Sequence, residues 1–153
     1  SGSIWVSTFH SSCVRILRRH IDRIGFDTNF TIYDADDSKS LMKDICKRLE
    51  IDTKIYKEKS FLAAISSAKD ELITPTELMQ RALTSSDYAK RKQAEVYREY
   101  QEALHKNNAL DFDDLIMKTV ELLQSDTEVK KLLSGTFSLY YGGRVSGYEY
   151  GTV

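Results

Sequence analysis

Apolar residues recur every three or four positions along most of this chain, which is the spacing of one face of an α-helix. Val14, Leu17 and Ile21 follow this spacing, and the pattern stops at Gly25. Glycine commonly ends a helix, while Ser, Thr or Asp followed by carboxylates commonly begins one. These signals predict a bundle of six to seven helices, over residues 11–24, 34–49, 60–72, 74–84, 87–106, 111–123 and 126–133.

The two ends of the chain carry a different pattern. Residues 4–8 are mostly β-branched or aromatic and predict a short strand or its stub. Five of the seven glycines and four of the nine tyrosines lie in the last 19 residues, where Gly142 and Gly143 separate segments 136–141 and 144–150 as in a β-hairpin. We therefore expect a mainly α fold, a compact bundle with a small β-hairpin or sheet formed by the C-terminal tail and the N-terminal strand.

The composition is that of an ordinary soluble domain, since 41% of the 153 residues are hydrophobic and 29% are charged. The net charge of -1 neither supports nor excludes a polyanionic partner, because binding depends on local patches. Cys13 and Cys46 occupy apolar helical positions, which favours buried free thiols and a cytoplasmic protein. No apolar run reaches the roughly 18 residues of a membrane span, so we expect no membrane partner. Residues 1–3 are typical of a cloning remnant.

Segment 7–12 brings hydroxyl groups, an aromatic ring and an imidazole to the expected start of the first helix. Hydroxyls and helix-terminal N–H groups at Thr8, His10 or Ser11 can contact phosphates, and Phe9 can stack on a base. In the alternative interpretation, Thr8 and Ser11 only cap the helix and Phe9 belongs to the core. A metal site is not indicated, because no other histidine or cysteine lies at a zinc-like spacing from His10.

Four arginines follow along the same predicted helix, at Arg15, Arg18, Arg19 and Arg23. They form either a stripe that faces phosphates, with an affinity that falls steeply with salt, or a solvated face paired with nearby carboxylates. The pattern alone does not decide between the two interpretations.

Asp111, Asp113 and Asp114 also allow two interpretations. Clustered carboxylates can bind Mg²⁺, but Asp111 is a typical N-cap and the other two suit the positive end of a helix dipole, so we expect a structural role. The chain contains no Gly-x-x-x-x-Gly-Lys-Ser/Thr loop and no strand that ends in paired acidic residues. These motifs hold phosphates and magnesium in ATPases, so we expect no catalytic residue, metal site or cofactor in this chain.

Four segments of the chain match a known pattern in their order and spacing. Residues 8–11 are Thr-Phe-His-Ser, residues 13–19 are Cys-Val-Arg-Ile-Leu-Arg-Arg, residues 63–72 are Ala-Ala-Ile-Ser-Ser-Ala-Lys-Asp-Glu-Leu, and residues 110–116 are Leu-Asp-Phe-Asp-Asp-Leu-Ile. The first two resemble the motif between the ATP-binding loop and the acidic motif in UvrD/PcrA/Rep-type superfamily 1 DNA helicases. The last two resemble the helical subdomain 1B of that family.

The resemblance assigns residues 4–134 to subdomain 1B with its flanking motif. The acidic Asp-Glu-x-x-Asp motif of the family does not follow, which leaves residues 135–153 as an unrelated tail on an excised subdomain.

The resemblance implies a parent protein that unwinds DNA in the 3′ to 5′ direction with ATP and Mg²⁺, acts in DNA repair, and binds single-stranded or junction DNA. It implies DNA contacts from this chain through Thr8, Phe9, His10, Ser11, Arg15 and Arg19. We expect the chain alone to bind DNA weakly or not at all. A second hypothesis is a protein-interaction or self-assembling helical module, in which the tail offers a pairing edge for a homo-oligomer.

Overall fold

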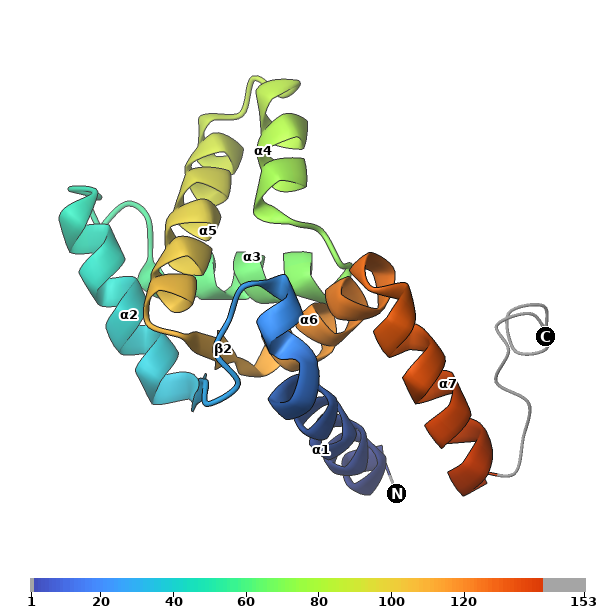
Figure 1. Cartoon of the computed structure of the whole chain (residues 1–153). Helices are drawn as coiled ribbons and strands as arrows, with labels where there is room; N and C mark the ends of the chain where they lie inside the picture. The colour runs from blue at the N-terminus through green and yellow to red at the C-terminus, as the bar shows by residue number, and fades with distance from the viewer. Residues whose placement is uncertain (1, 142–153) are drawn as a thin grey trace.

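Seven α-helices account for most of the residues that the structure describes. The computed structural model describes the backbone of residues 2–141 and the side chains of residues 8–135. The elements are, in order, α1 (Gly2–His20), the 3₁₀-helix η1 (Ile21–Ile24), β1 (Thr31–Tyr33), α2 (Ala35–Arg48), α3 (Glu58–Asp70), α4 (Pro75–Leu83), α5 (Tyr88–Lys106), β2 (Ala109–Asp111), α6 (Phe112–Ser125) and α7 (Thr127–Tyr141) (Figure 1). The expected mainly α fold with six to seven helices is confirmed over this range. None of the helices in the described residues is long and apolar enough to cross a membrane.

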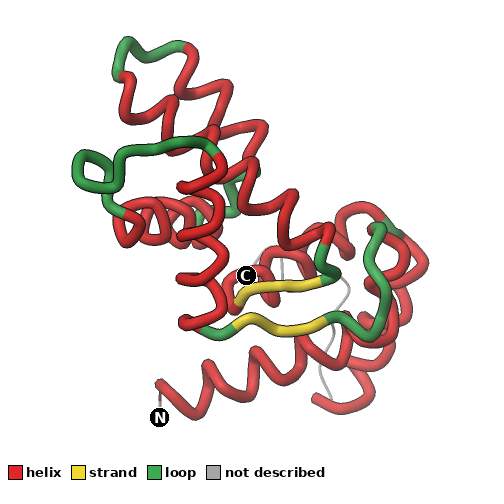
Figure 2. Tube along the Cα trace, turned by 90° about the vertical axis from the view of Figure 1, so that its left-hand side faces the viewer, coloured by secondary structure: helices red, strands yellow, loops and turns green. Residues whose placement is uncertain are grey.

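The two short strands pair in parallel although they lie far apart in the sequence (Figure 2). Thr31 pairs with Ala109, Ile32 with Leu110, and Tyr33 with Asp111. A parallel pair needs a long connection between its strands, and helices α2 to α5 form that connection here. Side chains alternate between the two faces of a strand, so Ala109 joins one hydrophobic core and Leu110 joins another. The strand pair therefore lies between two cores.

Each core is built by a different set of helices. The first gathers buried residues of α2, α3 and α5, including Met42, Ile45, Cys46, Phe61, Ile65, Val96, Tyr97, Tyr100 and Leu104. The second packs α1 and η1 against α6 and α7, through Cys13, Leu17, Ile21, Phe26, Phe30, Leu110, Leu115, Leu122 and Val129. Cys13 and Cys46 are both buried free thiols, as the sequence predicts. The second core fixes the position of α1, which carries most of the predicted site residues.

The strands expected at the chain ends are wrong over the described residues. Residues 4–8 belong to α1, and residues 136–141 belong to α7, which continues well past the predicted end at residue 133. Extending an existing helix costs less than starting a new element, and this outweighs the weak β-propensity of these residues. Residues 144–150, the other arm of the expected hairpin, lie outside the described residues. The observed strands come instead from segments 31–33 and 109–111, which the pattern assigned to connections except for Asp111, placed at the start of a helix.

Matching capping boxes begin α2 and α6, each directly after a strand. The Asp37 backbone N–H donates to the Asp34 carboxylate at 2.8 Å, and the Asp34 N–H donates back to Asp37 at 3.0 Å. Asp111 and Asp114 make the same exchange, at 2.9 and 3.2 Å. The predicted caps are therefore confirmed. Because the two strands are parallel and in register, the two helix N-termini lie side by side.

Two further helix boundaries confirm the sequence interpretation. Gly25 ends η1 with a φ of 92°, in the left-handed region that glycine enters without strain. Thr74 accepts a hydrogen bond from the Glu77 backbone N–H, with Pro75 at the first helical position of α4.

Candidate nucleic-acid interface

Four of the predicted site residues share one solvent-exposed face of α1. Thr8, Ser11, Arg15 and Arg19 are spaced by three and four residues, which places them along one side of a helix, and all four are exposed. The opposite side of α1 is buried in the second core. The structure therefore assembles two hydroxyls and two guanidinium groups into a single polar stripe, hereafter the α1 stripe.

The expected position of this segment at a helix N-terminus is wrong. Because α1 begins at Gly2, residues 8–12 lie inside the helix, where each backbone N–H pairs with the carbonyl four residues earlier. The N–H groups are therefore not available to hold a phosphate, and Thr8 and Ser11 do not cap the helix. Contacts to DNA from this segment have to come from side chains alone.

Phe9 is not a core residue, because 54% of its side chain is exposed. It lies beside the α1 stripe, and its ring can reach a partner molecule. The alternative interpretation that placed Phe9 in the core is wrong. An exposed aromatic ring beside cationic side chains is the combination that proteins use to bind single-stranded nucleic acid without reading its sequence.

His10 lies at the edge of α1 that faces α6. Its ring stacks on Phe112, with centroids 4.5 Å apart and ring planes inclined by 27°. Phe112 is the first residue of α6 and is 56% exposed. Its spacing of three residues from the buried Leu115 is typical of a core position, but the structure leaves Phe112 exposed. The place of Phe112 directly after the N-cap Asp111 could have indicated its exposure, because a side chain there can project beyond the end of the helix.

The four arginines divide between the two roles that the sequence left open. The Arg18 guanidinium donates to the carbonyls of Thr28 and Phe30 and lies 3.8 Å from the centre of the Phe30 ring. Arg23 pairs with Asp126 at 2.8 Å and holds the pKa of that carboxyl below its usual range. Of these four arginines, Arg15 and Arg19 make no ion pair with any described residue, and both are exposed.

Two of the three aspartates at the start of α6, Asp111 and Asp114, form part of an internal network. Lys69 of α3 lies 2.8 Å from Asp111 and 3.0 Å from Asp114. Tyr100 donates to Asp111 at 2.9 Å, and Gln101 donates to Asp114 at 3.4 Å. Burial raises the pKa of Asp114, although the adjacent ammonium of Lys69 acts against that shift. Within the described residues, no group of three His, Cys, Asp or Glu side chains is arranged to hold a metal ion.

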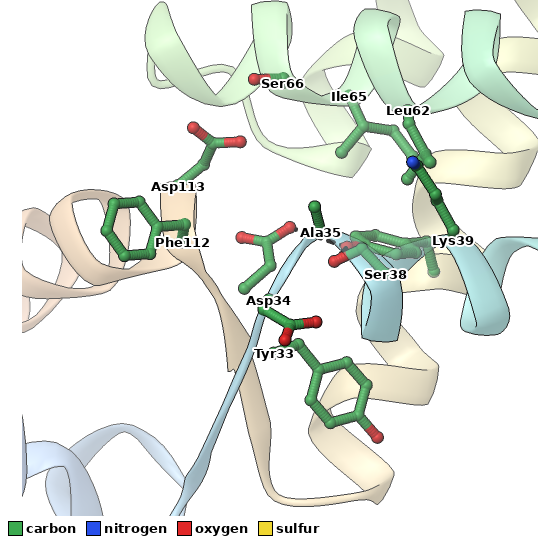
Figure 3. Close-up of a pocket in the computed structure, with 12 residues that line it drawn as sticks. Tyr33, Asp34, Ala35, Ser38, Lys39, Leu62, Ile65, Ser66, Phe112 and Asp113 are labelled. Atoms are coloured by element: carbon green, nitrogen blue, oxygen red, sulfur yellow. Dashed lines mark hydrogen bonds between the residues drawn. The ribbon is translucent and has the colours of Figure 1, made fainter.

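A cleft of about 460 Å³ opens where β1 and β2 meet their helices (Figure 3). Asp34 and Asp113 lie on one side of it, and Leu62, Ile65 and Ser66 of α3 lie across from them. Burial raises the pKa of Asp113 above its usual range. Carboxylates outnumber Lys39 in the lining, so the cleft itself is not suited to hold a phosphate group.

The described residues thus form a mainly helical domain with exposed cationic and aromatic side chains on α1. The chain belongs to the UvrD/REP helicase N-terminal domain family, whose pattern matches residues 1–139. Over 134 residues it is 48% identical to the ATP-dependent DNA helicase PcrA of Staphylococcus aureus (strain Mu50 / ATCC 700699). It is 47% identical, over the same length, to the helicase of that name from Staphylococcus epidermidis (strain ATCC 12228 / FDA PCI 1200). The resemblance to UvrD/PcrA-type helicases is confirmed.

The matches cover most of this chain and little of its relatives. They include 88% of this chain and 18% of each PcrA protein, so the chain spans about 18% of the length of the relatives it matches.

Proposed function

We propose that this chain is subdomain 1B, with its flanking Thr-Phe-His-Ser motif, of a PcrA-type DNA helicase. Its relatives are named ATP-dependent DNA helicases. In this proposal the parent protein unwinds DNA in the 3′ to 5′ direction with ATP and Mg²⁺, and its partner is single-stranded or junction DNA. This chain contributes DNA contacts and no ATP chemistry.

The observation that carries the proposal is the surface formed by the α1 stripe and the neighbouring aromatic rings. Arg15 and Arg19 neutralise backbone phosphates, and the hydroxyls of Thr8 and Ser11 donate hydrogen bonds to phosphate oxygens. Phe9 and the outer face of Phe112 offer exposed rings on which bases can stack. The cationic groups and Phe9 thus lie on or beside the exposed side of α1, while the Phe112 ring lies where α1 faces α6, so a strand that crosses α1 can contact both.

The carboxylates at the start of α6 do not fit a magnesium site. All four side-chain oxygens of Asp111 and Asp114 accept hydrogen bonds, from Lys69, Tyr100, Gln101 and the two backbone N–H groups of the capping box. A metal ion would have to displace Lys69 from a site that is almost fully buried. In the proposal, ATP and Mg²⁺ are therefore held by parts of the parent other than this chain.

A titration by nuclear magnetic resonance (NMR) tests the DNA contacts. The chain labelled with ¹⁵N is titrated with a single-stranded dodecamer at low and at physiological salt. We expect a dissociation constant of about 10⁻⁴ M or weaker, because the binding groove is shared with other parts of the parent. Shift changes should centre on α1 and the start of α6. Arg15→Ala and Arg19→Ala should each lower the dependence of log Kd on log salt by about 1.

A matched control removes one charge elsewhere. Lys90 lies in the first turn of α5, at the far end of the molecule from α1 (Figure 1), so Lys90→Ala should leave affinity and salt dependence unchanged. Equal effects of Lys90→Ala and Arg15→Ala would contradict the proposed surface. Submicromolar binding that is insensitive to salt, or no shift change on α1 at millimolar DNA, would contradict it as well.

A further inference from the structure

A buried lysine joins α3 to the first turn of α6. The Lys69 side chain has no exposed surface, and its Nζ lies 2.8 Å from Asp111 Oδ2 and 3.0 Å from Asp114 Oδ1. The same ammonium lies 5.1 Å from the centre of the Tyr100 ring. An unpaired ammonium in this position would be very costly, so the ion pairs restrict Lys69 and both carboxylates to one arrangement.

The same carboxylates also form the capping box of α6. One oxygen of each aspartate accepts a backbone N–H across the first turn, and the other faces Lys69. The Tyr100 hydroxyl donates to Asp111 and lies 3.0 Å from Ser38 Oγ, which extends the network to α5 and α2. The first turn of α6 is therefore attached to three other helices of the first core.

Phe112 lies in the backbone between these two attached residues. Asp111 directly before it and Asp114 two residues after it are held in place, and its own ring projects outward to stack on His10 of α1. His10 belongs to the helix that packs in the second core. The stack therefore joins Phe112, which is held in place through the first core, to His10, which is held in place through the second core.

Stability alone does not account for a buried ion triad. Apolar replacements of buried ion pairs are often as stable or more stable, because desolvation offsets much of the attraction. A hydrophobic contact at this position would also be less directional than the two charge-assisted contacts of Lys69. The geometry thus favours a role in placing the backbone that carries Phe112.

We propose that Lys69 is a positioning residue for DNA binding: through Asp111 and Asp114 it holds Phe112 in its stack with His10, where the ring can receive a base. This proposal rests on the proposed function for its DNA step. Its structural step, the placement of Phe112 by Lys69, is testable without DNA.

The first measurement follows the Cε1 proton of His10 by NMR in the whole chain. A neighbouring aromatic ring in a stacked arrangement shifts such a proton upfield, and Phe112→Leu defines the position without the stack. Lys69→Met, which keeps the length of the side chain and removes its charge, should move the signal to the Phe112→Leu position. Ile45→Ala, a destabilising change in the same core but away from the ion pairs, should leave the signal where it is in the original chain.

Asp114→Asn serves as a second, milder variant in case Lys69→Met does not fold. The asparagine keeps an oxygen for the capping box but loses its charge toward Lys69. The His10 signal should move part of the way toward the Phe112→Leu position. If Lys69→Met folds, or if Asp114→Asn is measured in its place, an unchanged His10 signal would overturn the proposal.

The second measurement compares a thymidine dodecamer with an abasic dodecamer of the same length. The original chain should prefer the base-bearing strand at least about fivefold, since one stacked base contributes about 1 kcal/mol or more. Lys69→Met should reduce this ratio toward the Phe112→Leu value, with abasic binding unchanged because the α1 stripe is intact. If the original chain shows no preference, the stacking part of the proposed function fails, while the His10 signal still decides the role of Lys69. If the preference exists and Lys69→Met keeps it, the inference fails.

Discussion

Truncating Leu17 should loosen the attachment of α1 to the rest of the molecule. Leu17 has 0% exposed surface and lies in the second core, on the side of α1 opposite the α1 stripe. Removing a fully buried leucine side chain costs the transfer free energy of its methyl groups and leaves a cavity. Leu17→Ala should therefore lower the free energy of unfolding by about 3 kcal/mol. For a chain of this length, the melting temperature should fall by about 6 to 12 °C.

Urea denaturation followed by circular dichroism at 222 nm measures this loss. Arg15→Ala, on the exposed side of the same helix, is the matched control and should change stability by less than about 0.5 kcal/mol. The urea dependence should stay the same, since the surface exposed on unfolding hardly changes. A loss below about 1 kcal/mol for Leu17→Ala would show that α1 is not packed in the core. The placement of His10 beside Phe112 would then lose its basis.

Two further predictions concern a turn and an ion pair. Gly25→Ala should destabilise the fold by about 1 to 2 kcal/mol, because the residue has a φ of 92° while a Cβ there meets only ordinary contacts with His105 at 3.6 Å. An unchanged urea midpoint would contradict this. Arg23 lowers the pKa of Asp126 in the folded chain below its unfolded value, so the pair stabilises fully above about pH 4 and loses its effect as the pH falls toward the folded pKa. Urea midpoints of the original chain and of Arg23→Ala should therefore converge on acidification, and equal separation at every pH would refute the prediction.

Local signals in the sequence predicted helices well. The caps at Asp34, Thr74 and Asp111, and the stop at Gly25, all appear in the structure because each depends on hydrogen bonds or backbone angles within a few residues. The strands were missed for the opposite reason. Segments 31–33 and 109–111 are three residues long and are stabilised by each other across a large sequence separation, which no local pattern records.

The candidate site was predicted only in part. The resemblance selected Thr8, Ser11, Arg15 and Arg19, but the pattern placed Thr8 in a strand, so their common helix face appears only in the structure. The four arginines could not be separated, because the partners of Arg18 and Arg23 come from other elements. Burial of Lys69 was also beyond a sequence pattern, since a lysine in a helix is ordinarily exposed. Only the packing of α3 against α6 shows that its charge is neutralised inside the molecule.

The parallel pairing of β1 and β2 has a consequence for how the domain can vary between relatives. The chain leaves the strand pair after Tyr33 and returns at Ala109, so the segment from α2 to α5 begins and ends within neighbouring strands. Tyr33 and Ala109 lie one strand spacing apart across the pair and two residues apart along it, so the two ends of this segment are held about 8 Å apart whatever lies between them. Insertions or deletions at the turn between α4 and α5 would therefore change the length of this helix pair without altering the arrangement of α1 and α6. Sequence length should vary most in the turn at residues 84–87 and least in the two strands.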